Sequence, residues 1–444
     1  MFDKEFEQIF DIAKKKNIQK FDVFLTQENS FSVKSFRQKV ESFKYADSIG
    51  LGIRVVIGNS AGYAYTEKLD KQSLETTMVK AKENAEYIET DDIIEFENYP
   101  DIEKKLEIFH PEIEKVNVKE KIEKVKLMEK SAHNFDKKVV NVPYNSIGND
   151  KMFTKIANSK GLQKEYVGNA AYGYAMCLAQ GGKETKSGYF YKISDDFSKI
   201  NSKEIGEESA KKALELLGAQ EIKSGKYPVI FNNEMGADIL STFSNIFSAK
   251  AVQDGLSLLK GKLKSKIAND IVSISDDALL KNGFSTRPFD DEGYPSQTTE
   301  IISNGTLQSY LHNSITAKKD KTKSTGNAGR SYKSTVTISP SNFFIKNGTS
   351  SEKDLYKFYP KCVEIVSLSG LHSGCNSISG DFSIGAEGFY YENGERKYPV
   401  HNFTISGNFF QLLQNIIAIG NNLKFNMNSI GSPSILIKTM DISG

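Results

Sequence analysis

Apolar residues recur along the first part of the chain with two different periods. Within 2–13 they are spaced as on one face of a helix, which predicts an amphipathic opening helix. Apolar and polar residues then alternate across 21–25 and again across 31–35, a pattern typical of strands. The polar residues 28–30 between these runs predict a turn. We therefore expect a helix followed by a β-hairpin.

The same two patterns continue to about residue 222. Glycine-containing segments at 58–62 and 158–161 each separate two apolar runs and predict hairpin turns, since a glycine such as Gly161 takes a positive φ easily. Helical spacing of apolar residues predicts further helices at 74–88, 118–132 and 202–217. Asp70 is a suitable N-cap for the first of these helices. The acid-rich stretch 89–103 predicts a solvated connector.

The rest of the chain has short β-type runs punctuated by glycine. An apolar strand at 227–231 leads into 232–234, where an asparagine cap and an early glutamate favour a helix start. One more helix is expected at about 409–419. We predict an α+β fold of two domains, an α/β N-terminal domain at 1–222 and a β-rich C-terminal domain with a few helices at 223–444.

Charge and composition exclude several classes of protein. The 444 residues carry a net charge of only +2, and no patch mixes basic and aromatic residues, which argues against nucleic-acid binding. A hydrophobic content of 39% with only 10 prolines excludes general disorder and a collagen-like chain. The apolar stretch 409–420 is interrupted by amides and too short for a membrane span, and the acidic start argues against a signal peptide. We expect a cytoplasmic protein without membrane contact.

Metal ligands and nucleophiles are sparse. A helical zinc peptidase motif needs two imidazoles one turn apart and an adjacent glutamate. None of the five histidines is followed by glutamate or lies one helical turn from another, so this chain cannot form that motif. The three cysteines form no CxxC pair and are predicted to be reduced thiols. The sequence therefore predicts no metal site and no cofactor held by this chain alone.

Two further features carry polar groups without a defined role. Carboxylate pairs occur at 276–277 and 290–292, but neighbouring acids are common in turns. The segment 370–388 holds five glycines among small polar residues, so its backbone can be approached closely by an extended peptide, or it forms tight turns and bulges. Adjacent residues on a strand point to opposite faces, which argues against a hydrolase pair formed by His372 and Ser373.

Segments spread over most of the chain resemble the TldD/PmbA family. They are found in family order at 50–56, 62–66, 257–263, 289–293, 316–318, 324–327, 370–374, 379–382, 406–408 and 431–434. The resemblance implies one of two subunit types. The TldD type carries His-Glu-x3-His on a helix and a cysteine near the C-terminus, whereas the TldE/PmbA type lacks these zinc ligands. At the matching positions this chain has Asn233, Glu234 and Asp238, and no cysteine in 426–431, so it is similar to the TldE/PmbA type.

The resemblance implies a function for such a subunit. It would form a heterodimer with a TldD-type zinc protease subunit that degrades or processes extended or unfolded peptides in the cytoplasm. Zinc and the catalytic residues would then belong to the partner, and this chain would form part of the substrate passage. By polar type and position, we expect Arg54, His372, Ser373, Asn376 and Asp381 to bind substrate there.

Two alternatives stay open. One is a stand-alone, homodimeric peptide-binding or regulatory protein without catalysis. The other is an unconventional metallopeptidase that uses Glu234 and Asp238 together with His372 or Cys375. Metal analysis of the purified chain and peptidase assays with and without a TldD-type partner distinguish these alternatives.

Overall fold

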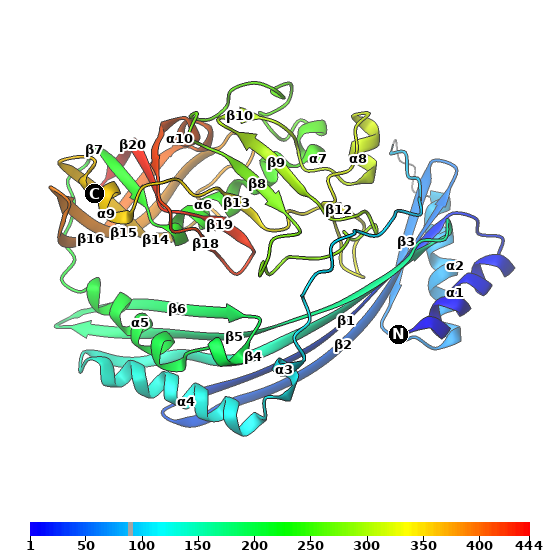
Figure 1. The fold of residues 1–444 in the computed structure, drawn as a ribbon, viewed down its shortest axis with the longest axis horizontal. Coiled ribbons are helices and arrows are strands. Elements are labelled where there is room, and N and C mark those ends of the chain that lie inside the picture. Colours follow the sequence, from blue (N-terminus) through cyan, green and yellow to red (C-terminus); the bar gives the residue numbers. More distant parts are fainter. Residues whose placement is uncertain (88–91) are drawn as a thin grey trace.

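The N-terminal half of the chain is built on one long antiparallel sheet. A computed structural model describes residues 1–87 and 92–444. The sheet has the strand order β3-β2-β1-β4-β5-β6. Its strands are β1 (Phe21–Phe36), β2 (Lys39–Ile57), β3 (Ser60–Thr66), β4 (Val139–Asn158), β5 (Gln163–Gly181) and β6 (Glu184–Ser194). Figure 1 shows that this sheet bends along its length and that the C-terminal half lies inside the bend.

Helices cover one face of the sheet. They are α1 (Asp3–Lys15), α2 (Lys71–Tyr87), α3 (Pro111–Lys115), α4 (Val118–Phe135) and α5 (Ser202–Glu215), with a 3-10 turn, η1 (Phe197–Lys199), before α5. Ala171 and Ala175 of β5 pack in one apolar cluster with Val125 of α4 and Ile205 of α5. A second cluster joins β1, β2 and β4 to α1 and α2. Because side chains alternate along a strand, the other face of the sheet points toward the C-terminal half.

The C-terminal half contains a small barrel. The sheet order is β16-β15-β14-β7-β20-β17, and an additional pairing of β16 with β20 closes the ring. Its strands are β7 (Gly225–Phe231), β14 (Lys361–Ser369), β15 (Asp381–Glu392), β16 (Glu395–Asn408), β17 (Ile416–Ile419) and β20 (Ile435–Ser443). Ring closure pairs β7, β14, β15, β16 and β20 on both sides, which limits pairing with other chains there, and β17 is attached to the ring through β20.

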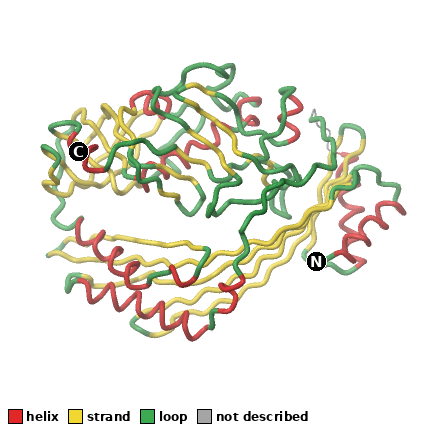
Figure 2. Tube along the Cα trace, viewed as in Figure 1, coloured by secondary structure: helices red, strands yellow, loops and turns green. Residues whose placement is uncertain are grey.

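A second sheet packs beside this barrel, in the order β10-β9-β8-β13-β19-β18. Its strands are β8 (Ile274–Asp277), β9 (Thr298–Ser303), β10 (Thr306–Leu307), β13 (Phe343–Ile345), β18 (Lys424–Phe425) and β19 (Ile430–Ser432), and β11 (Ala328–Gly329) pairs separately with β12 (Thr337–Ile338). The helical elements are α6 (Asn233–Phe243), η2 (Ser244–Phe247), α7 (Ala249–Gln253), α8 (Ser314–Lys319), α9 (Glu352–Lys357) and α10 (Phe409–Asn415). Figure 2 shows that loops connect much of this half.

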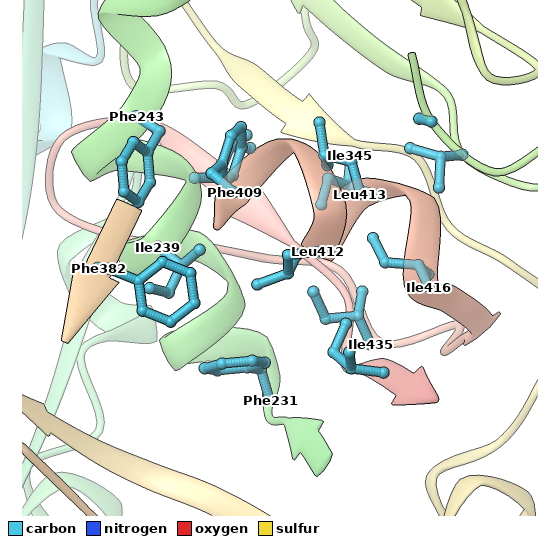
Figure 3. Packing of buried hydrophobic residues seen from close by; sticks show 14 of the residues in the cluster. Phe231, Ile239, Phe243, Ile345, Phe382, Phe409, Leu412, Leu413, Ile416 and Ile435 are labelled. Carbon is cyan, nitrogen blue, oxygen red and sulfur yellow. The ribbon is translucent and has the colours of Figure 1, made fainter. Parts of the chain in front are cut away.

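The core of the C-terminal half lies between α6, α10 and the strands. Figure 3 shows Phe243, Phe409 and Leu412 among the residues that meet there. The rings of Phe243 and Phe409 stack with centroids 4.7 Å apart. Residues of β7, β13, β15 and β20 belong to the same cluster, so α6 is held in position by both sheets. The start of this helix is therefore fixed in space by the core beneath it.

The predicted α+β fold is confirmed, and most elements lie where the periods indicated. The hairpin turns at 58–62 and 158–161 connect β2 to β3 and β4 to β5, and Gly161 has a φ of 91°. The predicted helix at 74–88 corresponds to α2, although residue 88 lies outside the described residues. Within the described part of the chain, no helix is long and apolar enough to cross a membrane.

Two predicted boundaries are wrong. The expected turn at 28–30 is the middle of the continuous strand β1, because Glu28 is paired with Ser48 on one side and Met152 on the other. Pairing on both edges overrides the local turn preference. The helix expected at 409–419 ends at Asn415, and the following residues form β17 because they pair with β20.

Candidate functional site

The first turn of α6 lies at the junction of the two halves. Asn232 accepts a hydrogen bond from the backbone N–H of Met235 at 2.9 Å, which confirms the expected cap. Glu234 follows in the first turn with its side chain only 10% exposed. Lys212 of α5 donates to both carboxylate oxygens of Glu234, at 2.8 and 2.7 Å, and Lys424 of β18 donates to one at 2.5 Å. Glu234 therefore joins the helical layer of the N-terminal half to the C-terminal half.

The two ammonium groups determine the protonation of this cluster. Burial alone would raise the pKa of Glu234, but attraction by Lys212 and Lys424 outweighs burial and lowers that pKa. Burial lowers the pKa of Lys212, assisted by repulsion from Lys424 and opposed by attraction to Glu234. Asp238, one turn further along α6, has its pKa raised by burial and by the charge of Glu234. Glu234 is thus a compensated carboxylate and a weak proton acceptor.

Aromatic rings of β6 surround the lysines. The Lys212 ammonium lies 5.4 Å from the ring centroid of Tyr189, and the Lys424 ammonium lies 5.0 Å from that of Phe190. Such ring faces stabilise a cation. Tyr191 donates from its hydroxyl to the carbonyl of Phe425 at 3.2 Å. The cluster is therefore anchored on β6 as well as on α5 and β18.

This cluster does not fit a metal ion. Among the described residues, no group of three or more histidine, cysteine, aspartate or glutamate side chains is placed to hold one. The lone pairs of Glu234 point at Lys212 and Lys424, and a metal cation beside them would meet two positive charges. The Asn233 amide also has a partner, since it donates to the carbonyl of Asn422 at 2.9 Å.

Four of the five expected substrate-binding residues lie close together in the chain. Three are in the loop between β14 and β15, and the fourth, Asp381, is the first residue of β15. His372, Ser373, Asn376 and Asp381 are all exposed. Asn376 accepts hydrogen bonds from two backbone N–H groups inside the loop, at 2.9 and 3.1 Å. Asp381 accepts one from Asn408 at 2.8 Å, and this bond lowers its pKa. The loop is a tight, internally bonded structure that presents polar groups to solvent.

Arg54 belongs to a different cluster. Its buried guanidinium donates to Asp22 at 2.8 and 3.2 Å and to Glu292 of the C-terminal half at 3.4 Å. Arg330 lies 3.0 Å from the same Asp22 carboxylate. These ion pairs connect the N-terminal sheet to the C-terminal half. The assignment of all five residues to substrate binding stays a prediction.

The acidic turn at 290–292 is also more buried than its sequence indicated. Asp290 accepts backbone hydrogen bonds from Glu292 at 3.0 Å, Tyr294 at 2.9 Å and Ala328 at 2.9 Å. Burial and the neighbouring charge of Glu292 raise the pKa of Asp290 to about 7. The predicted turn is present, and Gly293 has a φ of 80°. Its acids stabilise the loop and the junction between the halves.

Sequence reasoning missed Lys212 and Lys424. Lys212 lies in a charged helical segment beside Lys211, Lys424 is a single lysine among apolar and amide residues, and the two are far apart in the chain. Only the docking of α5 and β18 against α6 brings their ammonium groups to one carboxylate. A motif search has no local signal for such a pair.

Comparison with known proteins gives matches over most of the chain. Three consecutive parts of the chain match domain models described as PmbA/TldA metallopeptidase domain 1 (residues 21–85), central domain (111–217) and C-terminal domain (224–444). The chain is also 30% identical over 436 residues to the metalloprotease PmbA homolog of Haemophilus influenzae, covering 95% of this chain and 92% of that protein.

The chain belongs to the PmbA/TldD metallopeptidase family. Within it, the protein is a PmbA-like member. A solved structure from Thermotoga maritima, described as a proposed modulator of a DNA gyrase, has a TM-score of 0.92 with 31% identity and covers both chains completely. TldE from Thermococcus kodakarensis has the same fold, with a TM-score of 0.91, 22% identity and coverage of 99% of this chain and 100% of the other. The family resemblance stated from sequence is confirmed.

Proposed function

We propose that this protein is the TldE/PmbA-type subunit of a two-subunit peptidase, holds no zinc itself, and acts in the cytoplasm. The supporting observation is the pairing of Glu234 with Lys212 and Lys424. The family description names a metallopeptidase, whereas in this chain ammonium groups take the lone pairs of the carboxylate at the start of α6. A TldD-type partner would then hold the zinc and carry out hydrolysis.

One edge of the N-terminal sheet supports a partner chain. Residues 39–49 of β2 pair with β1, and the pairing of β2 with β3 begins only at Leu51. Phe43 and Tyr45 in this stretch are exposed. A long strand edge with exposed aromatic residues is a favourable site for another chain. A TldD-type subunit is our proposed occupant, and a second copy of this chain is the homodimeric alternative.

The substrates of the complex would be extended or unfolded peptides, with this chain forming one wall of their passage. The exposed polar loop with His372, Ser373, Asn376 and Asp381 offers side chains for such contacts. For Arg54, contact with substrate would require its ion pairs with Asp22 and Glu292 to open.

The test is reconstitution. The full chain is purified alone and together with a TldD-type subunit from the same genome, and zinc content and cleavage of an unfolded peptide are measured for each. We expect neither zinc nor cleavage for the chain alone, and both for the complex. Stoichiometric zinc with peptidase activity in the chain alone would instead support an unconventional metallopeptidase. Peptide binding without cleavage in the presence of every available TldD-type subunit would support the stand-alone, non-catalytic alternative.

A further inference from the structure

The face of the N-terminal sheet that points to the C-terminal half contains a hollow. Ala171 and Ala175 of β5 face the helices, so the even-numbered residues of β5 lie on the opposite face. On that face Gly168 of β5 pairs with Met152 of β4. Ala170, two positions further along β5, pairs with Asp150 of β4. Two successive positions on β5 therefore lack a long side chain, and the sheet surface is depressed beside Met152.

A cavity of about 570 Å³ covers this hollow. The sheet contributes Met152, Gly168 and Ala170 to its lining, and the C-terminal half contributes the loop 279–287. Residues 104–110, which follow the acid-rich stretch and are here called the strap, form a further wall. The strap is fixed along the edge of β5, because the backbone N–H of Asn169 donates to the carbonyl of Ile108 at 3.1 Å. The volume lies in the range of about 300–1,000 Å³ that is usual for sites of small ligands.

Two apolar side chains line this cavity from different walls and are incompletely covered. Met152 of the sheet is 46% exposed, and Phe284 of the C-terminal loop is 43% exposed. Burial of such side chains by a guest is favourable by about 25 cal/mol per Å² of apolar surface. An apolar side chain of a ligand could therefore be buried between Met152 on the sheet and Phe284 on the C-terminal loop.

Tyrosines continue the same sheet face toward α6. Tyr172 and Tyr174 follow Gly168 and Ala170 on β5, and Tyr174 pairs with Tyr191 of β6. The ring of Tyr174 stacks on that of Tyr189 at 6.3 Å. All four tyrosines, here called the tyrosine row, are partly exposed. Tyrosine offers a large flat surface at low entropic cost, which suits peptides of varied sequence, although the Tyr191 hydroxyl already donates to the carbonyl of Phe425.

The charges around the cavity indicate the kind of ligand. Acidic and basic residues are mixed around it: Glu28, Asp150 and Lys151 belong to the sheet, Lys104 and Glu107 to the strap, and Lys281 and Arg287 to the C-terminal loop. Lining groups of both signs favour neither a polyanion nor a polycation. They suit a peptide, whose main chain carries both donors and acceptors.

We propose that this cavity and the tyrosine row bind an extended peptide of low net charge, with one apolar side chain seated between Met152 and Phe284. This inference rests on the proposed function for the claim that peptides reach the protein. It concerns this chain's own residues, so peptide binding is measurable on the full chain without a partner.

The experiment is fluorescence anisotropy with a labelled, uncharged peptide of about ten residues in which one leucine is flanked by serine and glycine. We expect the Met152→Ser/Phe284→Ser variant to bind at least about tenfold more weakly than wild type. The matched control is Val118→Ser/Leu127→Ser on the outer surface of α4, where the two side chains are 40% and 47% exposed, and it should bind like wild type. Urea unfolding checks that each variant is folded.

A second peptide and a second variant make the result specific. Replacing the leucine of the probe by serine should weaken binding to wild type by the same factor and have little further effect on the Met152→Ser/Phe284→Ser variant. Gly168→Val should also weaken binding, because its side chain would occupy the hollow. No binding by wild type, or equal binding by wild type, both cavity variants and the control, would overturn the proposal.

The test of the cavity can fail or succeed independently of the test of the proposed peptidase function. Peptide binding that depends on Met152 and Phe284, without cleavage in the presence of a TldD-type subunit, would support the cavity and contradict the peptidase assignment. Cleavage by the complex that is unaffected by the cavity variants, with unchanged peptide binding, would support the assignment and reject the cavity.

Discussion

Glu234 is held by two lysines from different elements, Lys212 on α5 and Lys424 on β18. Removing its carboxylate leaves two ammonium groups facing each other in a partly buried place. We therefore expect Glu234→Gln to lower the free energy of unfolding by about 2–3 kcal/mol. A residue that only favoured a helix start would cost at most about 1 kcal/mol. Urea denaturation followed by circular dichroism measures the difference.

Glu208→Gln is the matched control for this substitution. Its pair with Lys211 is long, at 3.5 Å, and exposed, so its loss should cost less than about 1 kcal/mol. Adding Lys424→Met to Glu234→Gln should restore part of the lost stability, because it removes one of the two facing charges. An effect of Glu234→Gln no larger than that of the control would show that the cluster contributes little. A large loss of peptidase rate in a normally assembled complex would show that Glu234 takes part in the chemistry.

Glu364 gives the protein a pH dependence. Its buried carboxyl accepts hydrogen bonds from Tyr356 at 2.8 Å and Tyr391 at 3.0 Å, and burial raises its pKa from 4.5 to about 7. The native state therefore keeps a proton that the unfolded chain has lost, so this contribution to stability is complete below pH 4.5 and is lost as the pH rises to about 7.

Glu364→Gln removes that titration and keeps a hydrogen-bonding side chain. The stability of wild type minus that of the variant should fall by on the order of 3 kcal/mol between about pH 4.5 and pH 7.5. Urea unfolding of both proteins across this range measures the change. Two parallel pH profiles would show that Glu364 titrates normally in the native state.

At the scale of elements, close contacts between backbones decide how the helices lie on the sheet. A Cβ atom at Gly188 of β6 would lie 2.3 Å from the backbone nitrogen of Ala213 in α5. One at Gly206 of α5 would lie 2.2 Å from the carbonyl oxygen of Met128 in α4. Both distances are far below contact, so these glycines allow α5 to approach β6 and α4. This approach places Lys212 beside Tyr189 and Phe190 of β6, where its ammonium group pairs with Glu234.

The length of β1 is also determined by contacts with elements distant in the sequence. Alternation in the sequence indicated strands on both sides of 28–30, but it also indicated a turn between them. The structure has one strand there, since β2 and β4 supply hydrogen-bond partners on both edges. The residues of β4 that pair with β1 lie more than a hundred positions away in the sequence. No local sequence pattern predicts pairing partners at that distance.

For the whole molecule, the cluster of Asp22, Arg54, Glu292 and Arg330 is a deeply buried charged contact between the N-terminal sheet and the C-terminal half. We expect Arg54→Met to lower the free energy of unfolding by about 3–5 kcal/mol, because it leaves two buried carboxylates with less compensation. Docking of the two halves should weaken as well. Urea denaturation and the rate of limited proteolysis measure the two effects.

Arg396→Met is the matched control, since the pair of Arg396 with Glu215 is at 3.2 Å but partly exposed. It should cost about 1 kcal/mol or less and leave proteolysis unchanged. Equal effects of the two substitutions would mean that the junction does not depend on the buried charges.

Much of the fold was predictable from sequence, but less of the candidate site was. The Asn232 cap, the turn at Gly293 and the glycine-rich loop with Asn376 were visible, because each depends on residues close in the chain. The roles of Arg54 and Glu234 were not visible, because the charge environment of a side chain depends on whatever packs within a few ångströms of it.

The sequence by itself determined the periods of helix and strand, the turns, the absence of a helical zinc motif and the family, since these are properties of neighbouring residues and of their order. Only the tertiary structure decided that two lysines hold Glu234, that Arg54 joins the two halves, and that a hollow beside Met152 faces Phe284. Each of these depends on segments distant in the chain that meet through strand order and docking. Electrostatic and apolar contacts act over a few ångströms in space, whatever the separation of the residues in sequence.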